Sequence, residues 1–139
     1  MKVDEEEKIL LVCEMGENRI LKYLLNENLS GNFTVFHQFM GRFGPSAIHC
    51  HNAKFYVSLY EFNDLGGNGL IAVLNQNGEV TERLALETGG EISGVCIYEE
   101  EESEEEFMLI SEGCNIYRVP MKRGEEESKL EESIVLSKS

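Results

Sequence analysis

Short apolar runs alternate with short polar segments along most of this chain. The clearest pair of runs is FYVSLYEF at 55–62 and GLIAVL at 69–74, joined by a polar segment rich in Gly and Asn. Val, Ile, Tyr and Phe suit a pleated surface, and Asn, Asp and Gly supply the positive φ angles of tight connections. The stretch 55–74 therefore predicts a β-hairpin.

Further runs of similar length precede and follow this hairpin, with no sustained helical period. Short strands at close spacing are typical of an antiparallel all-β fold. The segment 79–86 fits a strand or a short helix, and a strand is preferred because its neighbours are strands. The glycines and proline of 41–46 predict a loop. The other expected strands cover 9–15, 19–25, 33–40, 47–51, 92–98, 107–113, 115–121 and 133–137.

A single layout recurs three times: an apolar strand with an acidic residue near its end, a polar turn, and a second apolar strand. Val12, Val57 and Ile110 occupy matching positions, which gives periods of 45 and 53 residues. Periods near 40 to 50 with several strands per unit are typical of propeller blades. The sequence thus predicts antiparallel β-propeller blades, about three four-stranded repeats, in one domain at 9–137 behind a polar lead-in at 1–8.

Short motifs recur in these units: Gly44-Pro45-Ser46-Ala47-Ile48, Phe55-Tyr56-Val57, Glu14, Asn18-Arg19-Ile20 and Glu91-Ile92-Ser93-Gly94-Val95. In these motifs, over residues 9–121, the chain resembles six-bladed β-propellers of the gluconolactonase/senescence-marker, strictosidine-synthase-like and NHL-repeat type. Propellers typically have 4–8 blades, so three repeats do not close a ring. The resemblance therefore implies a fragment or isoform of a longer propeller, or a half-propeller that a partner protein or a second copy completes.

The resemblance also implies a metal site, because enzymes of the gluconolactonase type bind a divalent cation through Pro-Asn-Gly and Pro-Asp-Gly turns. The matching turns here read Pro45-Ser46-Ala47 and Ile92-Ser93-Gly94. Hydroxyls are poor substitutes for the carboxylates that calcium prefers. A non-catalytic protein-interaction module without a cofactor is therefore expected. The alternative is a metal-dependent hydrolase of lactones or esters, with Ca or Zn, whose site is completed outside this chain.

Other candidate ligands are few. His49 and His51 share one strand face and could form half of a zinc or copper site, although packing roles are favoured. Glu14, Glu61 and Glu112 recur near strand ends. They are expected to accept hydrogen bonds in turns; the alternative is a ring of acids that binds a cation or a basic peptide. No serine has the G-x-S-x-G context of a nucleophile, so no catalytic residue is assigned.

The charge is strongly acidic, with 26 Asp and Glu against 12 Lys and Arg and a net charge of −14. Such a chain is a poor partner for nucleic acid or an anionic membrane. No apolar run approaches the roughly 20 residues that span a bilayer, and the acidic start does not fit a secretory signal. A cytoplasmic location is expected. The cysteines lack CxxC spacing and are expected to be buried, inert thiols, with metal ligands or a redox pair as the alternatives: Cys13, Cys50, Cys96 and Cys114.

Much of the acidity lies in two loops, at 99–106 and 122–132. The first is an insertion relative to the middle repeat, and like charges at this density predict a solvated, disordered segment. It is a tolerated surface loop, a docking segment for a basic partner, or a phosphorylation site at Ser103, whose following acids suit an acidophilic kinase. Its acids are Glu99, Glu100, Glu101, Glu102, Glu104, Glu105 and Glu106.

Overall fold

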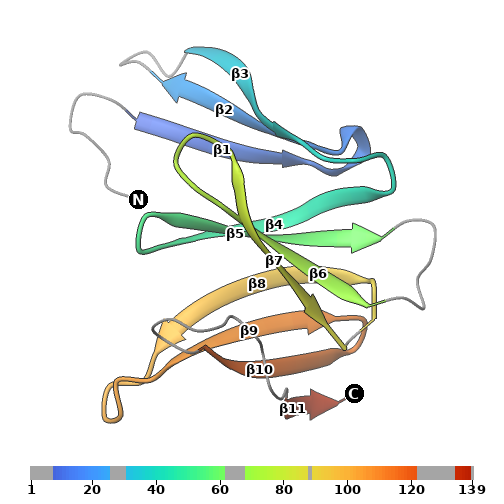
Figure 1. Cartoon of the computed structure of the whole chain (residues 1–139), viewed down its shortest axis with the longest axis vertical. Helices are drawn as coiled ribbons and strands as arrows, with labels where there is room; N and C mark the ends of the chain where they lie inside the picture. The colour runs from blue at the N-terminus through green and yellow to red at the C-terminus, as the bar shows by residue number, and fades with distance from the viewer. Residues whose placement is uncertain (1–7, 26–30, 62–67, 88, 122–133, 139) are drawn as a thin grey trace.

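The computed structural model describes residues 8–25, 31–61, 68–87, 89–121 and 134–138. The protein is all-β, with three antiparallel sheets that we call A, B and C. Figure 1 shows sheet B between the other two. Sheet A contains β1 (Lys8–Glu14), β2 (Arg19–Leu25) and β3 (Gly31–Gln38), with the short 3-10 turn η1 (Met15–Glu17) between β1 and β2.

Sheets B and C each have four strands, which follow one another across the sheet in sequence order. Sheet B contains β4 (Phe43–His51), β5 (Lys54–Glu61), β6 (Gly69–Leu74) and β7 (Val80–Leu86). Sheet C contains β8 (Ile92–Glu99), β9 (Glu106–Glu112), β10 (Asn115–Met121) and β11 (Ile134–Lys138). The all-β antiparallel prediction is confirmed, including the strand at 79–86.

Sheets B and C share a bulge in the first strand and a contact between two serine hydroxyls beside it. A bulge places Ser46 as the extra residue of β4 and Ser93 as the extra residue of β8. The Ser46 hydroxyl lies 2.8 Å from that of Ser58 on β5, and the Ser93 hydroxyl lies 3.0 Å from that of Ser111 on β9. The serines that stand in the two matching turns of the sequence therefore have matching structural positions.

Sheet A corresponds to only part of this unit. Val12 of β1 matches Val57 of β5 and Ile110 of β9, so β1 takes the place of the second strand of sheets B and C. No described residue pairs with the other edge of β1, where those sheets carry β4 and β8. Sheet A therefore has its first strand exposed at one edge.

Two apolar cores join the three sheets, one between A and B and one between B and C. Alternation along β5 sends Phe55 and Val57 toward sheet A and Tyr56 toward sheet C. Along β6, Ala72 and Leu74 likewise join the first core. Sheet B is covered on both faces, which explains why its two central strands have nearly continuous apolar sequences.

Two local expectations are wrong. Strand β4 begins at Phe43, inside the predicted loop, because Pro45 lies near the start of an edge strand where its missing N–H costs no hydrogen bond. The acidic segment is also ordered: Glu104 N–H donates to Glu100 O at 2.8 Å, and Glu100 N–H donates to Glu105 O at 2.9 Å. Pairing of β8 with β9 on both sides holds this turn, while its exposed carboxylates remain solvated and screened. The loop at 122–132 and residues 1–7 lie outside the described residues.

Candidate functional site

An apolar sheet face lies on the side of sheet A that points away from sheet B, and no other sheet of the described chain covers it. We call it the outer face. Cross-strand pairing sets Leu10 opposite Tyr23, Tyr23 opposite Phe33, Val12 opposite Leu21 and Leu21 opposite Val35. The rings of Tyr23 and Phe33 lie 5.4 Å apart. None of its members carries a charge; they are Leu10, Val12, Leu21, Tyr23, Phe33 and Val35.

The outer face of sheet A corresponds to a face that is buried in the other two sheets. Leu10 is 47% exposed, whereas its equivalents Phe55 and Met108 are 5% and 0% exposed. Phe55 is covered by sheet A and Met108 by sheet B. Leu10 has no preceding sheet above it among the described residues, and this difference accounts for its exposure.

The free edge of β1 lies beside a second surface that is only partly covered. Ile48 and Cys50 of β4 point toward sheet A and are part-buried. Their equivalents on β8, Val95 and Ile97, are 9% and 5% exposed, because β8 lies against both β4 and β5. The strand that would cover β4 in the same way has no counterpart among the described strands of sheet A.

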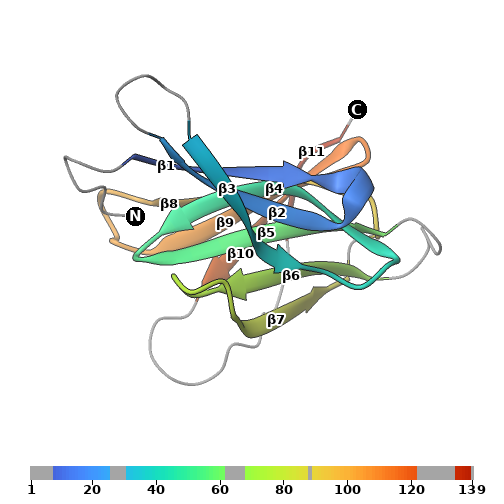
Figure 2. The same ribbon diagram turned by 90° about the horizontal axis from the view of Figure 1, so that it is seen from above.

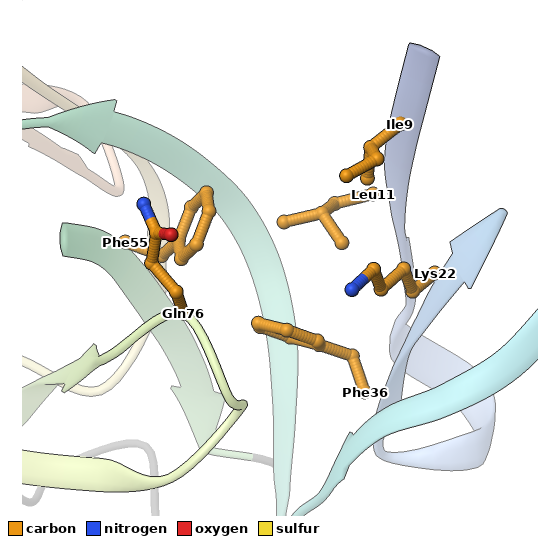
Figure 3. A pocket seen from close by; sticks show the side chains of 6 residues that line it. All are labelled: Ile9, Leu11, Lys22, Phe36, Phe55 and Gln76. Carbon is orange, nitrogen blue, oxygen red and sulfur yellow. The ribbon is translucent and has the colours of Figure 1, made fainter. Parts of the chain in front are cut away.

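A small cavity lies between sheets A and B, under β1 (Figure 3). Its volume is about 60 Å³, and the Nζ of Lys22 lies 5.9 Å from the centroid of the Phe36 ring. Sites for small molecules usually measure roughly 300 Å³ or more, so this space suits a single side chain or water rather than a metabolite. Its lining residues are Ile9, Leu11, Lys22, Phe36, Phe55 and Gln76.

The two strand histidines face sheet C. Their rings lie 6.5 Å apart, and His51 Nε2 lies 3.2 Å from Glu106 Oε2. Burial lowers the pKa of His49, the charge of His51 lowers it further, and a hydrogen bond with the backbone of Ile97 opposes the change. The described residues contain no group of three or more His, Cys, Asp or Glu side chains placed to hold a metal ion. The approach of Glu106 to His51 was missed from sequence, because it depends on how sheets B and C pack.

The three recurring glutamates lie on three different sheets. Glu14 pairs with Arg19 across the first hairpin. Glu61 is 3% exposed and lies 2.7 Å from the guanidinium of Arg42. The carboxylate of Glu112 lies against Gly89, where an added Cβ would fall 2.1 Å from Oε2. Each glutamate therefore has its own local packing environment.

Ser103 occupies the exposed tip of the acidic turn. Its hydroxyl donates to Glu100 Oε1 and accepts from Glu105 N–H, both at 3.3 Å. The surrounding acids from Glu100 to Glu105 are exposed. The hydroxyl is thus within reach of solvent while it helps to close the turn.

The expectation of four buried thiols is wrong, since Cys96 and Cys114 are exposed. Alternation along β8 explains Cys96: its neighbours Val95 and Ile97 enter the core, which turns Cys96 outward. Cys13 and Cys50 are part-buried, and no disulfide links any of the four.

These environments predict unequal thiol reactivity. Burial raises the pKa of the Cys13 thiol to about 11, so its thiolate fraction near neutral pH should be about 100-fold below that of an ordinary cysteine. Iodoacetamide labelling followed by peptide mass spectrometry should therefore modify Cys96 well before Cys13. The difference should disappear in urea, and equal rates in the folded protein would contradict the assigned burial.

Comparison with known proteins adds no relative: no family model, no curated protein and no solved structure matches this chain. In the part of the chain that the structure describes, no helix is long and apolar enough to cross a membrane.

Proposed function

We propose that this chain is a non-catalytic, β-propeller-type protein-interaction module. Its three sheets act as blades, and a partner protein or a second copy supplies the blades that complete the ring. The observation that carries this proposal is the outer face of sheet A. Leu10, Phe33 and Val35 on this face are about half exposed, although Leu21 between them is 3% exposed. The equivalents of Leu10 on sheets B and C, Phe55 and Met108, are buried under the preceding sheet.

The chemistry of the outer face suits a protein partner. Leu10 of β1 and Phe33 and Val35 of β3 are each about half exposed, at 47%, 53% and 48%, and Tyr23 of β2 lies between Leu10 and Phe33. Contiguous apolar patches of this kind mark protein interaction sites. Because these side chains are uncharged, a partner that docks on them avoids the repulsion that the net charge of −14 would create elsewhere on the surface.

The stacking of the sheets indicates how a partner would sit. Sheet B packs one face on sheet A and the other on sheet C (Figure 1). Seen from above, the strands of the three sheets overlie one another (Figure 2). A further sheet placed on the outer face of A would continue the same stack. In a closed ring that sheet would be the last blade of the partner, and the far face of sheet C would meet the partner's first blade.

The test is a charge placed on this face. Phe33→Glu should abolish assembly, because burying an unpaired carboxylate costs several kcal/mol, as roughly estimated from transfer data. Light scattering after size exclusion, over a range of concentrations, measures association with a second copy. Quantitative comparison of the proteins that co-purify from the native source measures association with a partner.

Thr34→Glu provides the matched control. Thr34 is the next residue of β3, is exposed, and pairs with Lys22 on the opposite side of the sheet. It should leave both measurements unchanged. Identical masses and identical co-purified proteins for the wild type and both variants would reject the proposal.

A further inference from the structure

The free edge of β1 has the geometry of a strand-binding site. In sheets B and C, the position beside the equivalent strand is filled by β4 and β8. The β4 register sets Ile48 opposite Val57 and Cys50 opposite Phe55, and the matching positions in β8 do the same in sheet C. A strand added to β1 in this register would run antiparallel to it, with apolar residues opposite Val12 and Leu10.

The burial of residues on β4 and β8 also indicates space for a strand beside β1. Ile48 and Cys50 are part-buried, while Val95 and Ile97 on β8 are almost fully buried. In sheet C these residues are covered by the first two strands of sheet B. Only one of the two equivalent strands, β1, lies against β4. An added strand would lie against β4 as β4 lies against β8.

The edge itself carries none of the usual protection against pairing. Natural edge strands are commonly guarded by charged residues, proline or bulges. Between Lys8 and Glu14, β1 reads Ile-Leu-Leu-Val-Cys, and its pairing with β2 is regular throughout. By contrast, β4 is itself an edge strand and contains Pro45 and a bulge. The edge of β1 is therefore suited to accept another strand.

The two strands that fill this position elsewhere indicate what chemistry it accepts. In register, β4 reads Ser46-Ala47-Ile48-His49-Cys50 and β8 reads Ser93-Gly94-Val95-Cys96-Ile97. Both have serine, a small residue, an apolar residue, a residue without an acidic group, and a second apolar residue. The serine also joins neighbouring sheets, since the Ser46 hydroxyl donates to Ile92 O of β8 at 2.7 Å.

We propose that the edge of β1 binds, by strand addition, an uncharged extended segment of a partner protein with the pattern Ser-small-apolar-x-apolar. This inference rests on the proposed function and names the partner segment and its site. Backbone hydrogen bonds along β1 supply affinity, and the two apolar side chains supply specificity by covering Leu10 and Val12. The net charge of −14 selects against acidic segments.

The probe is a fluorescent peptide with the sequence of residues 43–51, FGPSAIHCH, added to the full chain under reducing conditions. We expect saturable one-to-one binding by fluorescence polarisation, which a scrambled peptide does not show. Because alternate N–H groups of a strand point to opposite sides, methylating one alternate set of peptide nitrogens should abolish binding, and methylating the other should not. Equal effects of the two sets would reject strand addition.

Hydrogen exchange locates the peptide. Amides of β1 should gain protection, and those of β3, the other edge of sheet A, should not. Protection gained on β5 with loss on β4 would mean that the peptide displaces β4, and this result would overturn the proposal. Leu10→Asp should weaken binding about tenfold or more. Phe33→Glu, two strands away on the same face, should not weaken it.

These variants separate the two proposals. Assembly that Phe33→Glu abolishes, together with no peptide binding at β1, would reject strand addition and retain the interaction module. Peptide binding at β1, together with assembly that is indifferent to Phe33→Glu, would reject the blade-stacking module and retain the strand site.

Discussion

Gly78→Ala is expected to destabilise the protein by about 3 kcal/mol or more, a loss that belongs to the severe class of single substitutions. Gly78 lies in the turn between β6 and β7 with φ at +84°, a conformation that side chains other than glycine adopt at a cost. An added Cβ would also fall 2.2 Å from the carbonyl oxygen of Phe36 on β3. Because that obstacle is backbone, relief requires sheet A to move away from sheet B.

The same turn fastens the two sheets by a hydrogen bond. His37 Nδ1 donates to the Gly78 carbonyl at 2.9 Å, and strain at Gly78 would disturb this bond as well. Urea unfolding followed by circular dichroism measures the loss. Hydrogen exchange should show that β1 to β3 lose protection first.

Gly41→Ala is the control for this substitution. Gly41 has no positive φ, and an added Cβ meets nothing within 4 Å. The change should therefore stay within about 0.5 kcal/mol of the wild type. Similar stabilities for the two alanine variants would contradict the close approach of Gly78 to β3.

Ile71→Ala should cost about 2–5 kcal/mol, the range for removing a large aliphatic side chain from a packed core. Ile71 is 0% exposed and belongs to the core between sheets B and C. Sheet B holds the other two sheets together, so a cavity here should lower the urea midpoint of the whole domain in one transition.

Ile116→Ala removes the same atoms from a surface position. Ile116 on β10 is 40% exposed, and its loss should cost less than about 1 kcal/mol. Comparable destabilisation by the two variants would show that the B/C core is not the main source of stability. A transition that splits into two for Ile71→Ala would show that the sheets unfold separately.

Local sequence patterns predicted most of the strands, but they did not predict the start of β4 or the ordered acidic turn. The hairpin at 55–74 follows from apolar runs around Gly and Asn, which act over a few residues. The start of β4 was missed because Gly44 and Pro45 favour a loop locally, and only their position at a sheet edge makes a strand tolerable. The acidic turn was expected to be disordered because charge repulsion is visible in sequence, whereas the pairing of β8 with β9 is not.

The outer face of sheet A could not be predicted from the sequence, because it depends on how strands and sheets are arranged. The count of repeats predicted a ring that three repeats do not close, but it did not predict that sheet A has three described strands where sheets B and C have four. Leu10, Phe33 and Val35 look like any other strand residues in the sequence. Their grouping on one open face depends on the register of three strands and on which face sheet B covers. The exposure of Cys96 depends in the same way on which side of β8 the core takes.

The sequence by itself determined the all-β class, the three-fold repetition and most strand positions, because side-chain alternation and turn chemistry are local properties. Only the tertiary structure decided that sheet B is covered on both faces. It also decided that, among the described residues, no layer covers the outer face of sheet A and no strand pairs with β1 as β4 and β8 pair with β5 and β9. Burial and edge pairing depend on which layers meet, and residues far apart in the chain make those contacts.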